Sequence, residues 1–379
     1  MRITDLEVIS VRVNHRGDWL HVRLHTDEGL TGIGEASHGG FGPDRDAIVS
    51  AILLHQCQPV LRGRDPSAVV PAVSALRPLV DGLATATAVS ACEQALWDLA
   101  GKATGLPVYR LLGGPSRERI PLYANINRAT KERTPEGFAR SAAAAVADGF
   151  RAVKCAPFDG MDRAHVRDLD QRARRRLGLD CVAAVRDAVG QEVDVLVDCH
   201  SYFDVATALE VATELRRCGV SWFEEPLPTV DLDGLARLRP LVADLELIGG
   251  ETLFGLEGFW PYLGKGTWDV IMPDVKHCGG IGALLAISAL ADSRGVAVAP
   301  HNPSGPVAMI ASAHAAATLP HLRALEYAWG EVGWRESLVA PAERIVDGEL
   351  VLPTCPGLGM ALNEDTVVAH RGPDSQGSG

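Results

Sequence analysis

The sequence predicts an α/β protein in which a (β/α) barrel follows an N-terminal α+β unit. Two observations favour this fold class. Residues 1–35 alternate apolar and polar side chains, as half-buried antiparallel strands do. From Ile120 onward, short and nearly continuous apolar segments alternate with long amphipathic stretches, which is typical of a parallel sheet covered by helices.

The N-terminal unit, residues 1–117, combines strands and helices. Its expected strands are ITDLEVISVRV, DWLHVRLHTD and LTGIGEA. The spacing of apolar residues then predicts helices over 44–60, 66–77 and 87–104, with Gly105 as the stop of the last one. We therefore expect these residues to form a domain of their own.

Residues 118–340 carry the predicted barrel. One of its helices is expected to begin at Thr134, a capping residue that is followed by proline in the first turn. Eight β–α repeats within about 210 residues agree with the size of such a barrel. The expected strands are IPLYAN, FRAVKC, VDVLVDC, VSWFEE, LELIGGE, WDVIMPD, VAVAPH and LRALEY.

The remaining residues, 341–379, return to strand and turn character in the segment IVDGELVLP. They end in RGPDSQGSG, which has no apolar anchor, and we expect this last stretch to be a flexible tail. A C-terminal segment and a tail therefore complete the chain.

Composition narrows the possible functions. The chain has 379 residues, of which 47% are hydrophobic and 22% charged, which argues against a mostly disordered protein. A net charge of −12 argues against nucleic acid as a partner, because an acidic surface repels phosphate. We see no signal peptide, no apolar segment of the roughly 20 residues that a membrane helix needs, and no C-x-x-C pair. We therefore expect a cytoplasmic protein with free thiols and no membrane partner.

The ends of six successive predicted strands carry an ionisable residue. The six lie 23 to 27 residues apart, which is the length of one β/α repeat, so all of them fall on the same rim of the barrel. Barrel enzymes place their chemistry on that rim, at the carboxyl ends of the strands. The six residues are Asp198, Glu224, Glu251, Asp274, His301 and Glu326.

Three consecutive strands contribute only carboxylates, namely Asp198, Glu224 and Glu251. An all-oxygen set suits a hard cation such as Mg²⁺, which keeps coordination positions open for water and substrate. Without a cation, mutual repulsion would raise the pKa values of these carboxyl groups. The pattern therefore predicts a magnesium site.

Asp274 and His301 end neighbouring strands, so the carboxylate can fix the imidazole tautomer and raise its basicity. We expect His301 to act as a general base. His200, two residues after Asp198, can face the same rim and is either a second acid or base or a histidine outside the reacting centre. Lys154 ends the second barrel strand and is either a base or a residue that only hydrogen-bonds the substrate.

This set of residues suits removal of a proton α to a carboxylate. A positioned base contributes a factor of roughly 10²–10⁴, so the metal has to stabilise the resulting enediolate further as a Lewis acid. A protonated Glu326 would donate a hydrogen bond to the same oxygens.

A series of motifs occurs in order along nearly the whole chain. They are EQALWDLAGKATGLPVYRLLGG, VDCH, WFEEPLP, GGE, MPDVKHCGG, APHNPSGP and LEY. With these motifs the chain resembles the enolase superfamily, in its mandelate racemase-like subgroup. The resemblance implies a modified (β/α)7β TIM barrel and an α+β capping domain that the C-terminal segment rejoins. It also implies Mg²⁺ on the three carboxylates, an Asp274–His301 base pair, a Glu326 that supports the enediolate, and a homo-oligomer.

One position departs from the racemases of this subgroup. They carry K-x-K at the end of the second strand, whereas this chain has Lys154-Cys155-Ala156. Racemisation needs a base on each face of the enediolate, but dehydration needs one base and an acid for the departing β-hydroxyl. His200 matches that acid in members similar to galactonate dehydratase. The resemblance therefore implies an acid-sugar dehydratase of the aldonate type (galactonate- or gluconate-like) that forms a 2-keto-3-deoxy acid.

Two other functions stay open at this point. A racemase or epimerase of a 2-hydroxy or amino acid would use Lys154 and His301 as its two bases. A catalytically silent homologue would keep the metal ligands without turnover, although the complete set of ionisable strand ends argues against it.

Substrate contacts are expected from two loops of the first domain and from the barrel rim. In the family that the chain resembles, such loops set specificity, and here they fall near residues 14–19 and 36–43. Asn125 and Asn127 are candidate hydroxyl ligands or simple turn residues, and His277, in the dehydratase-like motif MPDVKHCGG, is a further expected contact. The loop candidates are His15, Arg16, Trp19, His38 and Phe41.

Overall fold

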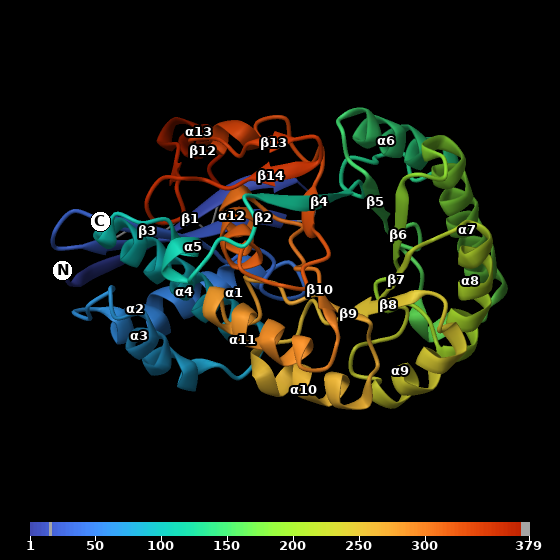
Figure 1. Ribbon diagram of the computed structural model, residues 1–379, viewed down its shortest axis with the longest axis horizontal. Coiled ribbons are helices and arrows are strands. Elements are labelled where there is room, and N and C mark those ends of the chain that lie inside the picture. The colour runs from blue at the N-terminus through green and yellow to red at the C-terminus, as the bar shows by residue number, and fades with distance from the viewer. Residues whose placement is uncertain (15–16, 373–379) are drawn as a thin grey trace.

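The computed structural model describes residues 1–14 and 17–372 and consists of two parts (Figure 1). A ring of strands and helices, coloured from green to orange, forms the larger part. A blue antiparallel sheet with its helices forms the other part, beside the ring (Figure 1). The predicted fold class, a barrel with an α+β cap, is confirmed.

The cap is built on three antiparallel strands, β1 (Ile3–Asn14), β2 (Gly17–Thr26) and β3 (Thr31–Glu35), which lie in that order. Helix α4 (Leu83–Thr104) packs on β3 so closely that a Cβ on Gly34 would stand 2.1 Å from the carbonyl oxygen of Ala91. Only glycine permits such an approach of two backbones. The sequence therefore sets the distance between helix and sheet.

The predicted cap helices are present with shifted ends. The stretch predicted as one helix over 44–60 is interrupted by a wide helical turn at Leu53–Cys57, where hydrogen bonds span five residues rather than four. The last helix begins four residues earlier than predicted and stops, as predicted, before Gly105, which has a φ of +73°. The shorter helices of this part are α1 (Arg45–Ile52), α2 (Gln58–Leu61), α3 (Val69–Leu76) and α5 (Val108–Leu111).

Eight parallel strands form the barrel and occupy the eight predicted segments. β4 pairs with both β5 and β11, and a bridge between Val298 and Leu322 closes the ring. The strands are β4 (Arg119–Asn125), β5 (Ala152–Cys155), β6 (Asp194–Asp198), β7 (Trp222–Glu224), β8 (Glu246–Gly249), β9 (Val270–Ile271), β10 (Ala297–Val298) and β11 (Leu325–Ala328).

A helix follows each of the first seven barrel strands, which gives the (β/α)7β arrangement. The first begins where the sequence predicts, because the Thr134 hydroxyl accepts a hydrogen bond from the Gly137 amide at 3.2 Å. The helices are α6 (Pro135–Ala147), α7 (Leu169–Val189), α8 (Val205–Arg217), α9 (Leu232–Leu238), α10 (Gly255–Lys265), α11 (Ile281–Asp292) and α12 (Pro306–Ala316).

The pairing register of the strands places Asp198 and Glu224 at the barrel mouth. Leu196 pairs with Trp222, and both belong to the apolar cluster that fills the inside of the barrel. Two residues further along the same strands, Asp198 pairs with Glu224. Because side chains two apart on a strand share a face, these carboxylates stand directly above the apolar filling.

Two carboxylates of the cap hold the starts of two barrel helices. Glu93 of α4 accepts hydrogen bonds from the amides of Ile281 and Gly282, both at 2.7 Å. Glu35 of β3 accepts from the amides of Gly305 and Ala308 at 2.8 and 2.9 Å. These helix starts have amides without intrahelical partners, and they follow the strands that carry the predicted base pair.

The C-terminal segment contacts both parts. β14 pairs antiparallel with β4 at the base of the barrel, and Arg371 forms a bridge with Val11 of the cap sheet. The division at residues 117 and 340 remains our proposal, and the expected tail at 373–379 lies outside the described residues. The elements of this segment are β12 (Val339–Ala340), β13 (Ile345–Val346), β14 (Glu349–Val351), β15 (Ala361–Leu362) and α13 (Glu364–Ala369).

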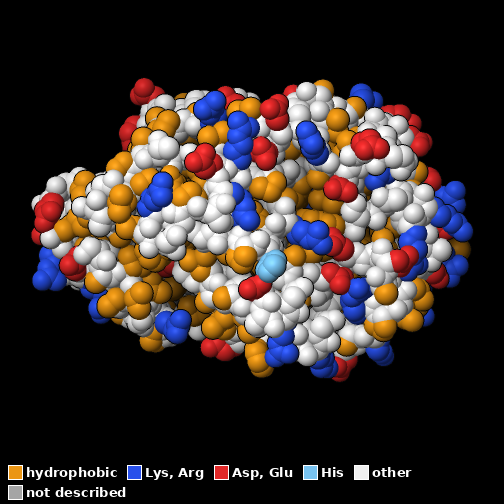
Figure 2. All heavy atoms as spheres, viewed as in Figure 1, with side chains coloured by type: hydrophobic (Ala, Val, Ile, Leu, Met, Phe, Trp, Pro, Cys, Tyr) orange, Lys and Arg blue, Asp and Glu red, His pale blue; other side chains and the backbone are white. Residues whose placement is uncertain are grey.

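The surface and the thiols agree with the composition. Acidic and basic side chains are interspersed over the face seen in Figure 2, without a large area of one sign. All eight cysteines are free thiols. In the described part of the chain, none of the helices combines the length and apolarity that a membrane span requires.

A buried ion pair joins the C-terminal segment to both parts of the molecule. Arg335 donates hydrogen bonds to the Glu343 carboxylate at 2.8 and 3.0 Å and to the Ser304 carbonyl oxygen at 2.6 Å. Its guanidinium lies 5.5 Å from the ring centre of Trp19 and 5.0 Å from that of Tyr327. The two charged side chains are only 4% and 2% exposed, so neither can turn to water if the other is lost.

We predict that Glu343→Gln lowers the free energy of unfolding by about 3 kcal/mol, because it leaves a buried guanidinium without its counter-charge. Urea denaturation followed by circular dichroism measures this change. The matched control is Asp180→Asn, which breaks an exposed ion pair with Arg176 on α7 and should change stability by less than about 0.5 kcal/mol. Equal effects of the two substitutions would contradict the prediction.

Candidate active site

A cavity of about 540 Å³ opens at the carboxyl ends of the barrel strands, beneath the cap. Its wall combines residues of the cap loop after β3 with residues that follow the barrel strands. The lining residues are His38, Gly40, Phe41, Arg45, Leu83, Asn125, Asn127, Arg128, Lys154, Asp198, His200, Glu251, Thr252, His277, His301 and Pro303.

The three predicted metal ligands lie at the ends of adjacent strands, and each already contacts a basic side chain: Asp198 and Glu224 end β6 and β7, and Glu251 follows β8. Together the three contacts bring positive charge to each carboxylate of the set. They are Lys154 Nζ to Glu224 Oε1 at 2.8 Å, His200 Nε2 to Asp198 Oδ2 at 2.9 Å, and His301 Nε2 to Glu251 Oε2 at 2.9 Å.

Glu224 is the least satisfied of the three carboxylates. Its Oε2 atom is shielded from solvent and has no hydrogen-bond partner among the described residues. Burial raises the pKa of Glu224 well above its usual range, and the neighbouring carboxylates Asp198, Glu326 and Glu251 raise it further, against the opposing effect of Lys154. An unpartnered carboxylate oxygen in this setting is costly unless a cation meets it.

The donor set fits a divalent cation. Oxygen ligands from three neighbouring strands suit a hard ion, and the unpartnered oxygen of Glu224 lies within that set. The residues that the structure describes contain no preformed cluster of metal ligands, and a basic side chain contacts each carboxylate of the set. A bound cation would compete with those three contacts.

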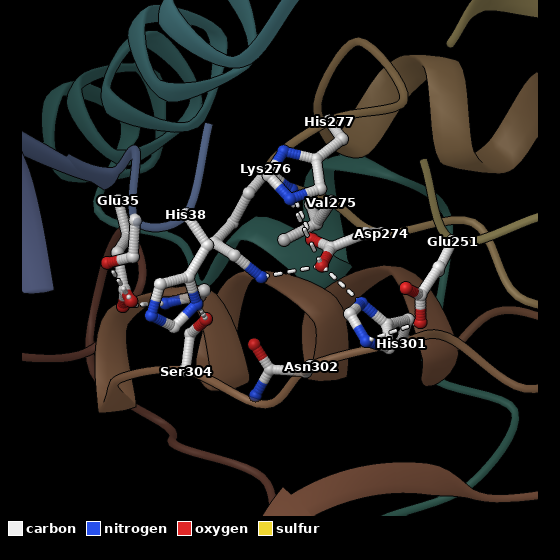
Figure 3. A network of polar contacts seen from close by, with 12 residues as sticks. Glu35, His38, Glu251, Asp274, Val275, Lys276, His277, His301, Asn302 and Ser304 are labelled. Carbon is white, nitrogen blue, oxygen red and sulfur yellow. Dashed lines mark hydrogen bonds and ion pairs between the residues drawn. The ribbon is translucent and has the colours of Figure 1, made fainter. Parts of the chain in front are cut away.

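His301 and Asp274 form the predicted pair (Figure 3). His301 Nδ1 lies 2.7 Å from Asp274 Oδ2, which leaves Nε2 on the side of Glu251. Burial opposes the charged form of His301, but Glu251, Glu326 and Asp274 outweigh it and raise its pKa to about 10. The imidazole is therefore oriented as a base, and it is protonated while Glu251 stays in contact.

Asp274 has a second basic partner that the sequence analysis missed. Lys276 Nζ contacts Asp274 Oδ2 at 2.6 Å, and its backbone amide donates to Oδ1 at 2.8 Å (Figure 3). The Lys276 side chain is fully buried. Burial opposes ionisation of Asp274, yet Lys276, His277 and His301 lower its pKa. Asp274 therefore remains a carboxylate that can orient His301.

His200 stands between two carboxylates. Its Nδ1 lies 2.5 Å from Asp159 Oδ1, and its Nε2 contacts Asp198 Oδ2. The His200 backbone has a φ of +43°, a conformation that non-glycine residues rarely adopt. Burial opposes the charged form, but Asp198 and Asp159 raise the pKa of His200 well above its usual range. The ring is therefore a protonated group at the cavity wall.

Lys154 and Glu326 form a buried ion pair at the cavity floor. Lys154 Nζ lies 2.9 Å from Glu326 Oε1 as well as 2.8 Å from Glu224 Oε1. Glu326 also accepts hydrogen bonds from the Asn125 side chain at 2.6 Å and the Asn302 amide at 2.9 Å. Burial opposes ionisation, but Lys154 and His301 lower the pKa of Glu326 to about 2. In this structure Glu326 therefore accepts hydrogen bonds, whereas the donor role expected from the sequence requires a protonated Glu326.

The expected substrate contacts divide into two groups. His38, Asn125 and His277 line the cavity, and so does Phe41, whose side chain is exposed. Trp19 is not among the described residues that line the cavity, so the expectation that it contacts the substrate is wrong. Its ring is fully buried in the cap, with its centre 5.4 Å from that of Trp334.

Two of the histidines that line the cavity are neutral. Burial lowers the pKa of His277 to about 4, and the ring contacts Thr87 of α4 at 2.9 Å. Burial, with Arg128, Lys276 and Arg45, lowers the pKa of His38 well below its usual range. The candidates His15 and Arg16 lie outside the described residues.

Among the charged residues that line the cavity, two lay outside the sequence-based expectations. Arg128 lines the cavity while paired with the buried Glu331, and Arg45 comes from the start of α1. The signal for Lys276 was available, because it follows Asp274 by two residues as His200 follows Asp198. For Asp159, in the loop after β5, the sequence offered no such spacing.

Family comparisons cover most of the chain. Residues 5–113 match the family described as Mandelate racemase / muconate lactonizing enzyme, N-terminal domain, and residues 137–366 match the family described as Enolase C-terminal domain-like. The crystal structure of a mandelate racemase/muconate lactonizing enzyme from Jannaschia sp. CCS1 matches with a TM-score of 0.86 and 30% identity, over 98% of each chain.

Curated relatives catalyse more than one reaction. The D-xylonate dehydratase of Haloferax volcanii is 32% identical and aligns with 97% of this chain and 88% of its own length. The D-gluconate dehydratase of Thermoproteus tenax is 32% identical over 92% of this chain and 69% of its own. The D-galactarolactone cycloisomerase of Agrobacterium fabrum is 30% identical over 98% and 96%.

We predict that Mg²⁺ raises the melting temperature of the protein, because a ligand that binds only the folded state stabilises that state. At a free Mg²⁺ concentration of a hundred times its Kd, the free energy of unfolding should rise by about 2.7 kcal/mol. Differential scanning fluorimetry with Mg²⁺, and with K⁺ at equal ionic strength, measures the effect.

Glu224→Gln should remove most of the Mg²⁺ shift, whereas Glu257→Gln, an exposed residue of α10, should keep it. A Mg²⁺ shift of the same size in both variants would mean that the ion binds elsewhere.

Proposed function

This chain belongs to the mandelate racemase/muconate lactonizing enzyme family of the enolase superfamily, and we propose that it is a Mg²⁺-dependent dehydratase of an acid sugar. The proposed substrate is an aldonate-type polyhydroxy acid, and the product is a 2-keto-3-deoxy acid. The named activities of the D-xylonate and D-gluconate dehydratases support the reaction class.

One observation carries the proposal: two histidines with different partners face each other across the cavity. His200 follows β6 and His301 follows β10, and these strands are four positions apart in the ring of eight. The two rings therefore lie on opposite sides of the mouth. This arrangement supplies a base and an acid to one substrate, as the loss of water requires.

His301 is the proposed base for the α-proton. Its Nδ1 is held by Asp274, which fixes the tautomer so that Nε2 can accept a proton. The Nε2 contact with Glu251 must be replaced before this can happen. A divalent cation held by Asp198, Glu224 and Glu251 would supply Lewis-acid chemistry to the substrate carboxylate.

His200 is the proposed acid for the β-hydroxyl. Its ring lies at the cavity wall, 32% exposed, and holds a proton between two carboxylates. Transfer of that proton to the hydroxyl turns it into water as a leaving group. The enol that remains tautomerises to the 2-keto-3-deoxy acid.

The epimerase alternative has less support, because Lys154 is held in a buried ion pair with two carboxylates. Its ammonium group lies between Glu224 and Glu326, and although burial opposes the charge, those two carboxylates raise the pKa of Lys154 well above its usual range. A base must be neutral before it can accept a proton. Position 156, where racemases of this kind hold a second lysine, is alanine.

We predict that a panel of aldonic and aldaric acids, incubated with the enzyme and Mg²⁺ in D₂O, contains at least one acid that is converted into a 2-keto-3-deoxy acid. Proton NMR detects the new methylene signal and identifies the substrate at once. His301→Asn should lower the rate by roughly 10²–10⁴-fold, since it removes the positioned base.

Inverted substrate that carries deuterium at the α-carbon, without loss of water, would refute dehydration and restore the epimerase. No change in any acid of the panel would favour a catalytically silent homologue.

A further inference from the structure

We propose that Asp159 is a positioning residue that orients His200 toward the departing hydroxyl, so that the site contains two carboxylate–histidine pairs rather than one. This inference rests on the proposed function, because it assigns a role to the acid of that reaction. Asp159 lies in the loop between β5 and α7, outside the ionisable residues that end the barrel strands.

The contact between the two residues is short and well shielded. Asp159 Oδ1 lies 2.5 Å from His200 Nδ1, and the Asp159 side chain is 16% exposed. The backbone amide of His200 donates to Asp198 Oδ1 at 2.9 Å. With the backbone fixed on one side and Nδ1 on the other, the ring has one orientation, in which Nε2 faces Asp198 at the cavity wall.

Arg133 holds Asp159 in place. Its guanidinium donates to Asp159 Oδ2 at 3.0 Å, to the Ala156 carbonyl oxygen at 2.5 Å and to the Asn127 carbonyl oxygen at 3.2 Å. Its charged end also stacks 4.6 Å from the ring centre of Phe138. One arginine thus ties the loop after β4 to the loop after β5, and the carboxylate between Arg133 and His200 cannot turn away freely.

The Asp159–His200 pair has the same arrangement as the Asp274–His301 pair. Asp274 holds Nδ1 of His301, and Asp159 holds Nδ1 of His200. In each pair the carboxylate accepts a hydrogen bond from Nδ1–H, so that Nε2 is the nitrogen that can react once its contact with Asp198 or Glu251 is replaced. On the His200 side, the Nε2 proton moves to the β-hydroxyl, and the carbon–oxygen bond breaks with its electrons on the departing water while the electron pair of the enediolate forms the double bond of the enol. His200 is then neutral, and its remaining Nδ1–H still donates to the Asp159 carboxylate.

The test compares Asp159→Asn with wild type in D₂O, using the acid that gives the fastest product formation in the panel. Asparagine keeps the size of the side chain but loses the charge that holds Arg133 and the imidazole. The matched control is Asp162→Asn, since Asp162 contacts His165 at 2.9 Å in the same loop, whereas Asp159 contacts His200 of the cavity wall.

We expect Asp159→Asn to lower kcat for dehydration by roughly 10- to 100-fold, the usual cost of removing such a supporting carboxylate, with KM changed less than about 3-fold. Deuterium exchange at the α-carbon of recovered substrate should increase relative to dehydration, because the His301 side still works. Asp159→Glu should restore part of kcat, and Asp162→Asn should behave as wild type.

A parallel loss of exchange and dehydration in Asp159→Asn would overturn the inference, because a general structural defect lowers both. If Asp159→Asn keeps the full dehydration rate while His200→Asn loses it, the role of Asp159 is overturned and the role of His200 stands. Full dehydration by His200→Asn would overturn the role of His200 as the acid of the proposed function, and the inference with it.

Nitrogen-15 NMR of the imidazoles adds a measurement without turnover. The His200 Nδ1 proton should be protected from exchange with solvent in wild type, and this protection should be lost in Asp159→Asn. An unchanged signal would also overturn the inference.

Discussion

The arrangement of the barrel mouth depends on neutralising carboxylates that are shielded from solvent. Five of them, four buried and one 20% exposed, gather at one cavity, where removing even one charge from water costs several kcal/mol unless a partner compensates. The structure supplies four basic side chains from four different barrel strands or the loops that follow them. The carboxylates are Asp198, Glu224, Glu251, Asp274 and Glu326, and the basic residues are Lys154, His200, Lys276 and His301.

This pairing of carboxylates with basic side chains explains how much of the site could be predicted from the sequence. The apolar strand lengths and the regular spacing of Asp198, Glu224 and their successors predict the barrel and its reactive rim, because alternation along a strand decides which face a side chain takes. Protonation states could not be predicted, since they depend on distances between strands. Glu326 is therefore a carboxylate that binds Lys154, rather than the hydrogen-bond donor that the sequence suggested.

Loop residues escaped the sequence analysis for a related reason. Asp159 reaches His200 from another loop, and no periodic pattern encodes such an approach. Trp19 was misjudged for the opposite reason: its place near a cap loop suggested the cavity, but a large apolar ring gains more by burial against Trp334. Local pattern thus predicts which residues share a rim, whereas long-range packing decides which of them meet.

The surroundings of Ala156 bear on how this enzyme can evolve. Its amide donates to the Asn127 side chain at 2.5 Å, its carbonyl oxygen accepts from Arg133, and its side chain is fully buried. A lysine at this position would have to enter a packed wall, and such overpacking costs about 1–3 kcal/mol. Under the proposed dehydratase function, a second base at position 156 would therefore require changes in the surrounding wall, at Asn127 or Arg133, in addition to the lysine itself.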